Sequence, residues 1–320
     1  MREFRRPKVV ISRCLGFDSC RYDGQIISSE FVNRLRDYVD CITPCPEVDI
    51  GLGIPRDSLR VVKKNNLLRF VQTNTEEDFT DEINEYSKNF LDELEEVDGF
   101  ILKEGSPSCG FKAVKYYPGI GKVASNSKGP GFFGGTILER FSQFPIENEG
   151  RLRNFNIREH FLTRLFLMPE IRELRKSNVI KELVDFQSKN KLMLMAYNQN
   201  HMRELGRLVA NNDNKPVEEL IAKYIDGFLM AISHTPRYTS NINVLMHGLG
   251  YFKEDLSTEE KAFFLDSLES YRKSKVPLSV PQYLLKYYIV KYNNDYLKSQ
   301  TYFEPYPEGL IEITDSGKGR

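Results

Sequence analysis

The sequence predicts an α/β domain with a doubly wound, Rossmann-like parallel sheet, followed by an all-α helical domain. Two observations support this fold class. Short β-branched runs alternate with apolar-periodic segments up to about residue 145, whereas beyond residue 150 glycine becomes sparse and only helical periodicity remains. In addition, 320 residues exceed what one hydrophobic core usually organises. We therefore expect two domains, residues 1–150 and 151–320.

The first domain shows three short strand patterns, each followed by a helical pattern. The predicted strands are 8–12 (KVVIS), 40–43 (DCIT, ending at Pro44) and 99–102 (GFIL), and the predicted helices begin near 29, span 79–97 and span 136–144. Thr75 and Asp78 resemble the N-cap of the middle helix. This β-α-β-α-β-α order is typical of a parallel sheet with right-handed crossovers.

The second domain is expected to contain four to six helices and no strands. The predicted helices lie within 151–187 with a break around Pro169, at 191–210, at 216–232, at 258–274 and from Pro281 to about 297. Ser257 and Glu260 form a candidate capping box for the fourth of these segments. The tail beyond Pro305 is predicted to be frayed.

Composition argues against several classes of function. The 45 basic residues balance the 45 acidic ones, so no global field attracts nucleic acid or an anionic membrane, and no segment is apolar enough to span a bilayer. All five cysteines precede residue 110, and an odd number in such a chain suits metal binding better than disulfides. We expect a cytoplasmic protein that binds neither DNA nor membranes; its oligomeric state is left open.

Three cysteines follow the three predicted strands. Cys14, Cys45 and Cys109 each lie in the loop where a strand ends, and parallel strands present these loops at one edge of the sheet. Three thiolates suit an iron–sulfur cluster, and zinc is the competing metal. On a four-iron cluster, three protein ligands would leave one iron open. Cys41 is predicted to face a core, and Cys20 is predicted to be a loop residue that could provide an alternative ligand.

Polar side chains lie beside the predicted ligands. Glu47 follows Cys45 by two residues and could act as a general base, hold a polar substrate or cap a helix. Ser106 and Ser108 precede Cys109 and offer hydroxyls to a substrate atom near the open iron. These residue types predict a catalytic site rather than a closed structural metal site.

Two more segments are expected at the same edge. Arg21 and Asp23 form a polar cluster after the first ligand, where they could bind substrate. The glycine-rich stretch 129–135 predicts a tight turn with a helix N-terminus facing the pocket, where it could hold a polar substrate edge.

Four motifs together resemble the thiouracil desulfurase (TudS-like) family. They are SRCL at 12–15, RYDG at 21–24, CPE at 45–47 and KEGSPSCG at 103–110, within a match covering about residues 7–146. The resemblance implies a [4Fe-4S] cluster on Cys14, Cys45 and Cys109, with Glu47 as the acid/base residue and Ser106 as the substrate contact. It also implies non-redox desulfuration of thiouracil or a related thiolated base or nucleoside, with release of sulfide.

Residues 151 to about 310 resemble a YbgA-like helical domain of unknown function, most visibly at RELGRL, 203–208. The implied partner of the whole chain is a small thiolated substrate. The alternative hypothesis is a binding module, in which an iron–sulfur cluster senses oxygen or redox state and the helical domain transmits the signal. The carboxylate and the serines beside the ligands favour the enzyme.

Overall fold

The computed structural model describes residues 2–210 and 214–316, which divide into two compact units. The α/β unit comprises Phe4–Pro169 and Tyr306–Arg320, and the helical unit comprises Met1–Glu3 and Glu170–Pro305. The division falls inside helix α5 (Phe155–Lys176). The boundary predicted near residue 150 stays a prediction.

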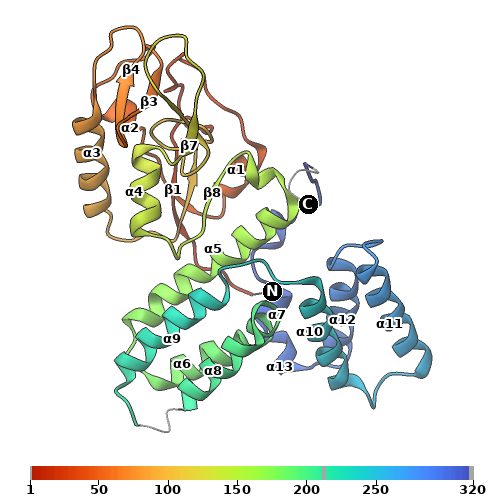
Figure 1. The fold of residues 1–320 in the computed structure, drawn as a ribbon. Helices are drawn as coiled ribbons and strands as arrows, with labels where there is room; N and C mark the ends of the chain where they lie inside the picture. The colour runs from red at the N-terminus through yellow and green to blue at the C-terminus, as the bar shows by residue number, and fades with distance from the viewer. Residues whose placement is uncertain (1, 211–213, 317–320) are drawn as a thin grey trace. The chain divides into compact units, whose positions relative to one another are not determined.

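The α/β unit is built on the predicted parallel sheet (Figure 1). Its strands, all parallel, lie in the order β2 (Asp40–Ile42), β1 (Lys8–Ile11), β5 (Gly99–Leu102) and β8 (Ile146–Asn148). The last strand was not predicted. Its helices are α1 (Glu30–Leu35), α2 (Pro46–Asp49), α3 (Thr80–Asp92) and α4 (Phe132–Arg140).

Both faces of this sheet are covered by helices. Side chains alternate along β1, so Val9 and Ile11 pack with α1 and α5, whereas Val10 packs with α3 and α4 on the opposite face. The doubly wound fold class predicted from the sequence is therefore confirmed.

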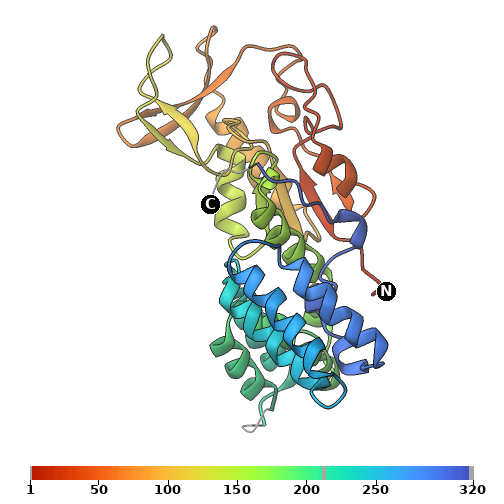
Figure 2. The same ribbon diagram turned by 90° about the vertical axis from the view of Figure 1, so that its right-hand side faces the viewer.

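A second, mixed sheet was not predicted. It has the order β4 (Leu67–Gln72), β3 (Leu59–Lys64), β6 (Val114–Tyr117) and β7 (Ser127–Gly129), and Figure 2 shows it in orange and yellow. Asn65 and Asn66 both have positive φ, as a two-residue hairpin turn between antiparallel strands requires. This turn signal was present in the sequence.

Two helix starts differ from their predictions. The N-cap of α3 is Phe79, and Asp78 accepts a hydrogen bond from the Thr80 N–H (3.0 Å), so the predicted capping by Thr75 is wrong. Helix α4 starts four residues earlier than predicted, because Gly131 serves as its N-cap and two helical glycines follow.

The helical unit contains α-helices and no strand within its described residues, which confirms the predicted class. Its helices after α5 are α6 (Ile180–Lys189), α7 (Lys191–Tyr197), α8 (Gln199–Ala210), α9 (Val217–Ala231), α10 (Tyr238–Leu249), α11 (Thr258–Arg272), α12 (Ser279–Lys291) and α13 (Asp295–Lys298). Short 3-10 helices lie at Gly250–Phe252 and Thr301–Phe303 here, and at Arg151–Arg153 and Glu308–Leu310 in the α/β unit.

The predicted count of four to six helices was too low. The segment 191–210 is interrupted at Asn198, whose extended backbone separates α7 from α8. Helix α10 was not predicted at all, and α13 begins separately at the N-cap Asn294. In contrast, α5 continues through Pro169, where buried residues on both sides of the proline, including Phe166 and Ile171, hold the helix together. The capping box of α11 is confirmed.

The segment after Pro305 is packed rather than frayed as far as Ser316. Tyr306 and Leu310 are buried in the core beneath α1 and α5. The buried guanidinium of Arg158 donates to the carbonyls of Glu312 (2.7 Å) and Thr314 (2.6 Å). The rest of the predicted tail, residues 317–320, lies outside the described residues.

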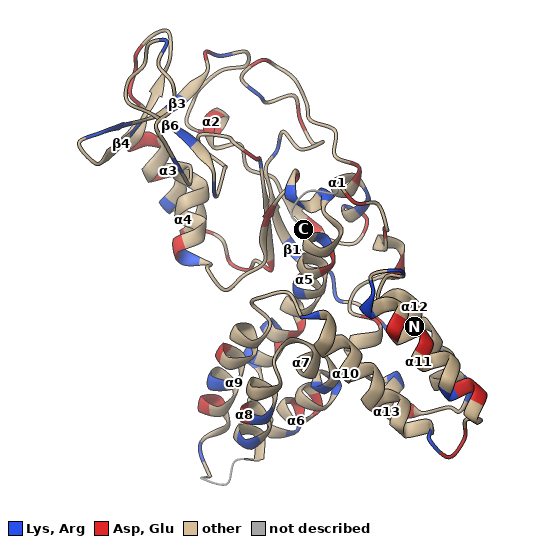
Figure 3. Ribbon diagram, turned by 45° about the vertical axis from the view of Figure 1, so that its right-hand side comes forward, with Lys and Arg blue, Asp and Glu red and all other residues tan. Residues whose placement is uncertain are grey.

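The distribution of charged residues and the hydropathy of the helices were also compared with the expectations from composition. Figure 3 shows acidic and basic residues interspersed along the helices rather than gathered by sign. Over the described ranges, no helix is both long and apolar enough to cross a membrane.

Candidate functional site

Four cysteines gather where the parallel strands end. Cys14 follows β1, Cys45 is the N-cap of α2 after β2, and Cys109 lies in the loop after β5. The fourth is Cys20, whose backbone carbonyl accepts a hydrogen bond from Cys45 Sγ (3.8 Å). Cys45 and Cys109 are close enough to interact electrostatically.

These thiols are mostly shielded from water. Cys20, Cys45 and Cys109 are buried, and Cys14 is half-buried. The neighbouring Cys14 raises the pKa of Cys20 to about 11, burial raises the pKa of Cys109 to about 12, and the neighbouring Cys20 together with burial raises the pKa of Cys45. Without metal the three thiols are therefore protonated at neutral pH, and a bound metal must displace their protons.

The donor set fits an iron–sulfur cluster. A single zinc ion would hold every thiolate at about 2.3 Å, which requires the sulfurs to converge on one point. Across residues 2–210 and 214–316, no three His, Cys, Asp or Glu side chains are grouped closely enough to hold one metal ion. Thiolates are ligands of both iron–sulfur clusters and zinc, so the chemistry of the donor set is compatible with either.

Glu47 is fixed by partners on two other loops. Its Oε2 accepts hydrogen bonds from Arg56 Nε (3.0 Å) and Nη2, and its Oε1 accepts one from Ser108 Oγ (2.7 Å). The Arg56 and Glu47 side chains are only 5% and 12% exposed. Glu47 does not cap its helix, because the Cys45 N–H donates to Asp49 instead (3.1 Å).

The two predicted serines extend this contact into a chain of hydrogen bonds. Ser106 Oγ lies 3.0 Å from Ser108 Oγ, which donates to Glu47. Ser106 is half-buried, whereas Ser108 is buried. Ser106 Oγ also accepts the N–H of Cys109 (3.1 Å), so the chain is attached to the loop of a predicted ligand. It leads from an accessible hydroxyl to a buried carboxylate.

Arg21 and Asp23 lie in the loop that carries Cys20. They pair with each other (3.1 Å), and their predicted contact with substrate stays a prediction. The same loop is bound to Arg56, which donates from its backbone N–H to the Tyr22 carbonyl (2.8 Å) and from Nη1 to the Cys20 carbonyl (3.1 Å).

Two residues that hold the site together were missed. Arg56 lies in a loop without periodicity, so no sequence pattern indicated that it reaches Glu47. Asp49 accepts hydrogen bonds from the Cys45 N–H, from Arg13 Nη2 (3.0 Å) and from Tyr86 Oη (2.7 Å). The sequence signal for this role was its position four residues after Cys45, which places it one helical turn away from the Cys45 N–H.

The N-terminus of α4 supports the Cys109 loop and is not free for substrate, so that expectation is wrong. The N–H groups of Gly131, Phe132 and Gly134 donate to the carbonyls of Gly110 (2.6 Å), Pro107 (3.2 Å) and Ser108 (3.0 Å), respectively. A Cβ on Gly134 would lie 2.5 Å from the carbonyl oxygens of Cys109 and Gly110. Only glycine permits this approach.

The fifth cysteine lies apart from the site. Cys41 pairs with Val9 in the parallel sheet and is half-buried against the hydrophobic cluster beneath α1. Its predicted packing role is consistent with this position.

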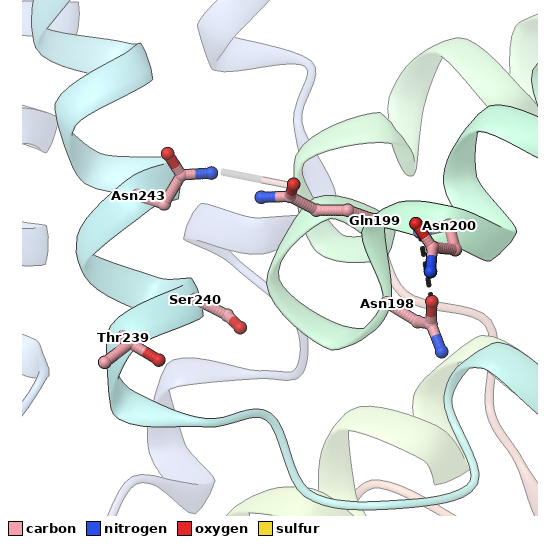
Figure 4. Close-up of a pocket in the computed structure, with 6 residues that line it drawn as sticks. All are labelled: Asn198, Gln199, Asn200, Thr239, Ser240 and Asn243. Carbon is pink, nitrogen blue, oxygen red and sulfur yellow. Dashed lines mark hydrogen bonds between the residues drawn. The ribbon is translucent and has the colours of Figure 1, made fainter.

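The helical unit contains a separate polar pocket of about 350 Å³ (Figure 4). It is lined by uncharged amides and hydroxyls from the α7–α8 junction and from α10, namely Asn198, Gln199, Asn200, Thr239, Ser240 and Asn243. The Gln199 and Asn243 side chains point toward one another. All sequence-predicted site residues lie elsewhere, in the α/β unit.

Comparisons with known proteins identify both parts of the chain. Residues 9–149 match the family model described as 2-thiouracil desulfurase, and residues 191–307 match the model described as a protein of unknown function (DUF1722). The uncharacterized protein YbgA of Escherichia coli (strain K12) is 30% identical over 158 residues, covering 49% of this chain and 93% of YbgA. The uncharacterized protein YbbK of Bacillus subtilis (strain 168) is 32% identical over 109 residues, covering 32% of this chain and 72% of YbbK.

One solved structure is also similar, the [4Fe-4S]-dependent thiouracil desulfidase TudS. It is 28% identical and covers 46% of this chain and 93% of its own, with a TM-score of 0.38.

Proposed function

Because the chain belongs to the 2-thiouracil desulfurase family through residues 9–149 and to the DUF1722 family through residues 191–307, we propose that it removes sulfur from thiouracil or a related thiolated base or nucleoside. The reaction replaces a thiocarbonyl C=S by C=O with water, and sulfide leaves. No electrons are transferred. The observation that carries this proposal is the hydrogen-bonded chain Ser106–Ser108–Glu47–Arg56 beside the gathered cysteines.

Cys14, Cys45 and Cys109 would hold a [4Fe-4S] cluster. When bound, the cluster would supply a Lewis-acidic iron with an open position for the substrate sulfur. The proposal rests on the donor set, which is made of thiols from three loops at the edge where parallel sheets bind ligands.

Side chains of the protein would accept the proton that the attacking water loses. Ser106 is the accessible end of the chain, where the attacking water would meet the protein. A proton from that water can pass through Ser108 to Glu47, because each step spans a hydrogen bond of 3.0 Å or less. Arg56 keeps the carboxylate in place for this transfer.

Arg21 and Asp23, in the loop that carries Cys20, would contact the polar edge of the base. A redox sensor would need neither this carboxylate nor these hydroxyls. The chain of hydrogen bonds therefore favours catalysis over the sensor hypothesis.

The test is a sulfide-release assay on the full chain. The protein would be purified without oxygen, its iron and acid-labile sulfide measured, and 2-thiouracil supplied without an electron donor. Glu47→Gln should keep the iron and lose activity, whereas Glu85→Gln, at an exposed position on α3, should behave as wild type. A fully loaded protein that releases no sulfide from thiouracil or a thiolated nucleoside would refute the proposal.

A further inference from the structure

The loop between Cys20 and Ile27 is anchored at both ends by residues of the candidate site. At its start, the Cys20 carbonyl accepts hydrogen bonds from Cys45 Sγ (3.8 Å) and from Arg56 Nη1 (3.1 Å). At its end, the Ile27 N–H donates to the carbonyl of Cys14 (2.9 Å). The residues between these two anchors therefore lie at the same edge of the sheet as the cysteines, next to the site.

A second loop meets this one beside Glu47. Arg56 donates from its backbone N–H to the Tyr22 carbonyl (2.8 Å) and from Nε to Glu47 (3.0 Å). The two loops also approach through Ile54, whose Cγ2 lies 3.9 Å from where a Cβ on Gly24 would be. A single arginine thus separates the backbone of Tyr22 from the carboxylate that would accept the proton.

The two loops carry exposed apolar side chains. These are Tyr22, Ile26 and Ile54, and among the described residues before 150 only Leu67 and Val123 are other large apolar side chains of comparable exposure. Single exposed apolar residues are ordinary on a protein surface, but three from two adjoining loops beside a candidate active site form a surface that an apolar part of a ligand can cover.

Tyr22 contributes a flat ring to this surface. The Cζ atom of Arg21 lies 5.6 Å from the centroid of the Tyr22 ring, and Arg21 itself pairs with Asp23 (3.1 Å). A guanidinium over one face of the ring orients it, and Tyr22 is still 45% exposed. An exposed aromatic ring is the side chain on which a nucleobase stacks, because every base has a flat π-face.

We propose that Tyr22 is a specificity-determining residue that stacks on the pyrimidine ring of the substrate, with Ile26 and Ile54 against the edges of that ring. This inference rests on the proposed function for the identity of the substrate. It implies selection of a cyclic thiocarbonyl compound such as 2-thiouracil over thiourea, which has the same N–C(=S)–N group without a ring. Arg21 and Asp23 would then bind the polar edge of the base whose face Tyr22 covers.

A binding experiment tests the contact without catalysis. The sequence contains no tryptophan, so Tyr22→Trp introduces a single indole fluorophore. The full chain, purified without oxygen and with its metal, would be titrated with uracil, which has the pyrimidine ring but no sulfur to remove. We expect saturable quenching of the indole fluorescence. Tyr287→Trp, at an exposed position on α12, is the matched control and should show no saturable quenching.

Kinetics test the effect on specificity. Loss of a base–aromatic stack should raise KM for 2-thiouracil by about 5- to 150-fold in Tyr22→Ala, and kcat should fall much less. Tyr22→Phe keeps the ring and should restore the low KM, which separates stacking from any role of the hydroxyl group. Tyr287→Ala should leave both constants as in wild type, and the iron content of each variant would be measured.

Two results would overturn the inference. The first is a Tyr22→Ala protein whose KM equals that of wild type or whose kcat alone falls, and the second is a Tyr22→Trp protein whose fluorescence uracil does not quench saturably. Tyr22→Trp and Tyr22→Phe conserve an aromatic ring, so they decide the question even if Tyr22→Ala does not fold. Saturable quenching of Tyr22→Trp in a chain whose wild type releases no sulfide would refute the proposed reaction and support the stacking contact.

Discussion

The pair Glu47–Arg56 is the most buried ion pair at the site, and each side chain depends on the other. Removing one partner of such a pair leaves an uncompensated charge away from water. We predict that Arg56→Ala lowers the free energy of unfolding by about 3–5 kcal/mol. Arg69→Ala breaks an exposed pair with Asp78 and should cost about 1 kcal/mol or less. Urea denaturation of both variants checks this; equal losses would show that burial does not strengthen the first pair.

Ser108 connects the accessible hydroxyl to the carboxylate, so its loss should interrupt proton transfer without removing a ligand. We predict that Ser108→Ala lowers kcat for sulfide release by about 10²–10⁴-fold. The iron content should stay as in wild type. Ser58→Ala, which changes an exposed serine bonded to Thr73, is the matched control. A loss of iron in Ser108→Ala would assign this residue to metal binding instead.

At the scale of residues, the positions of the cysteines were easier to predict from the sequence than the residues that hold the site together. The positions of Cys14, Cys45 and Cys109 just after strands could be predicted, because the end of a strand is visible in a run of β-branched residues. Their role as ligands stays a prediction. Arg56 could not, since its contact with Glu47 depends on how an irregular loop folds back over the site. Distances between such loops are set by tertiary packing, which has no local signal.

At the scale of elements, the N-terminus of helix α4 holds the Cys109 loop in place through backbone hydrogen bonds. We predict that Gly134→Ala pushes the helix away from the loop and lowers the iron content of the anaerobically purified protein. Gly135→Ala is the matched control, because its Cβ would meet only the Pro130 side chain at 3.5 Å. Alanine there should stabilise the helix by up to about 1 kcal/mol. Equal iron contents in the two variants would contradict this account.

The sheets show why some elements were predicted and others missed. The parallel strands carry continuous apolar runs such as GFIL in β5, which are typical of strands buried on both faces. The second sheet has mixed polar and apolar strands, and its β6 and β7 are short and lie in a glycine-rich segment. Its Asn65–Asn66 turn was nevertheless a readable signal. For helix α5 the local signal was misleading: Pro169 predicted a break, but tertiary packing keeps the helix continuous.

At the scale of the whole molecule, the α/β unit is discontinuous in sequence. Its core is completed by Tyr306 and Leu310, which follow the helical unit. We predict that Leu310→Ala lowers the free energy of unfolding of the α/β unit by about 2–5 kcal/mol. Ile313→Ala, at a side chain that is 77% exposed, should change it by no more than about 0.5 kcal/mol.

Thermal unfolding followed by near-ultraviolet circular dichroism would compare the two variants. If Leu310→Ala were as stable as Ile313→Ala, the C-terminal segment would contribute nothing to this core. For the same reason, a fragment ending at residue 150 would lack both α5 and the C-terminal segment.

The return of residues 306–316 to the first unit also determines when that unit can mature. During translation, the ribosome releases the N-terminal cysteines long before Tyr306 and Leu310 emerge. The nascent α/β unit must therefore wait, with part of its apolar surface uncovered, while the helical unit is synthesised. Under the proposed function, a cluster would therefore meet a complete α/β unit only after residues 306–316 have been synthesised.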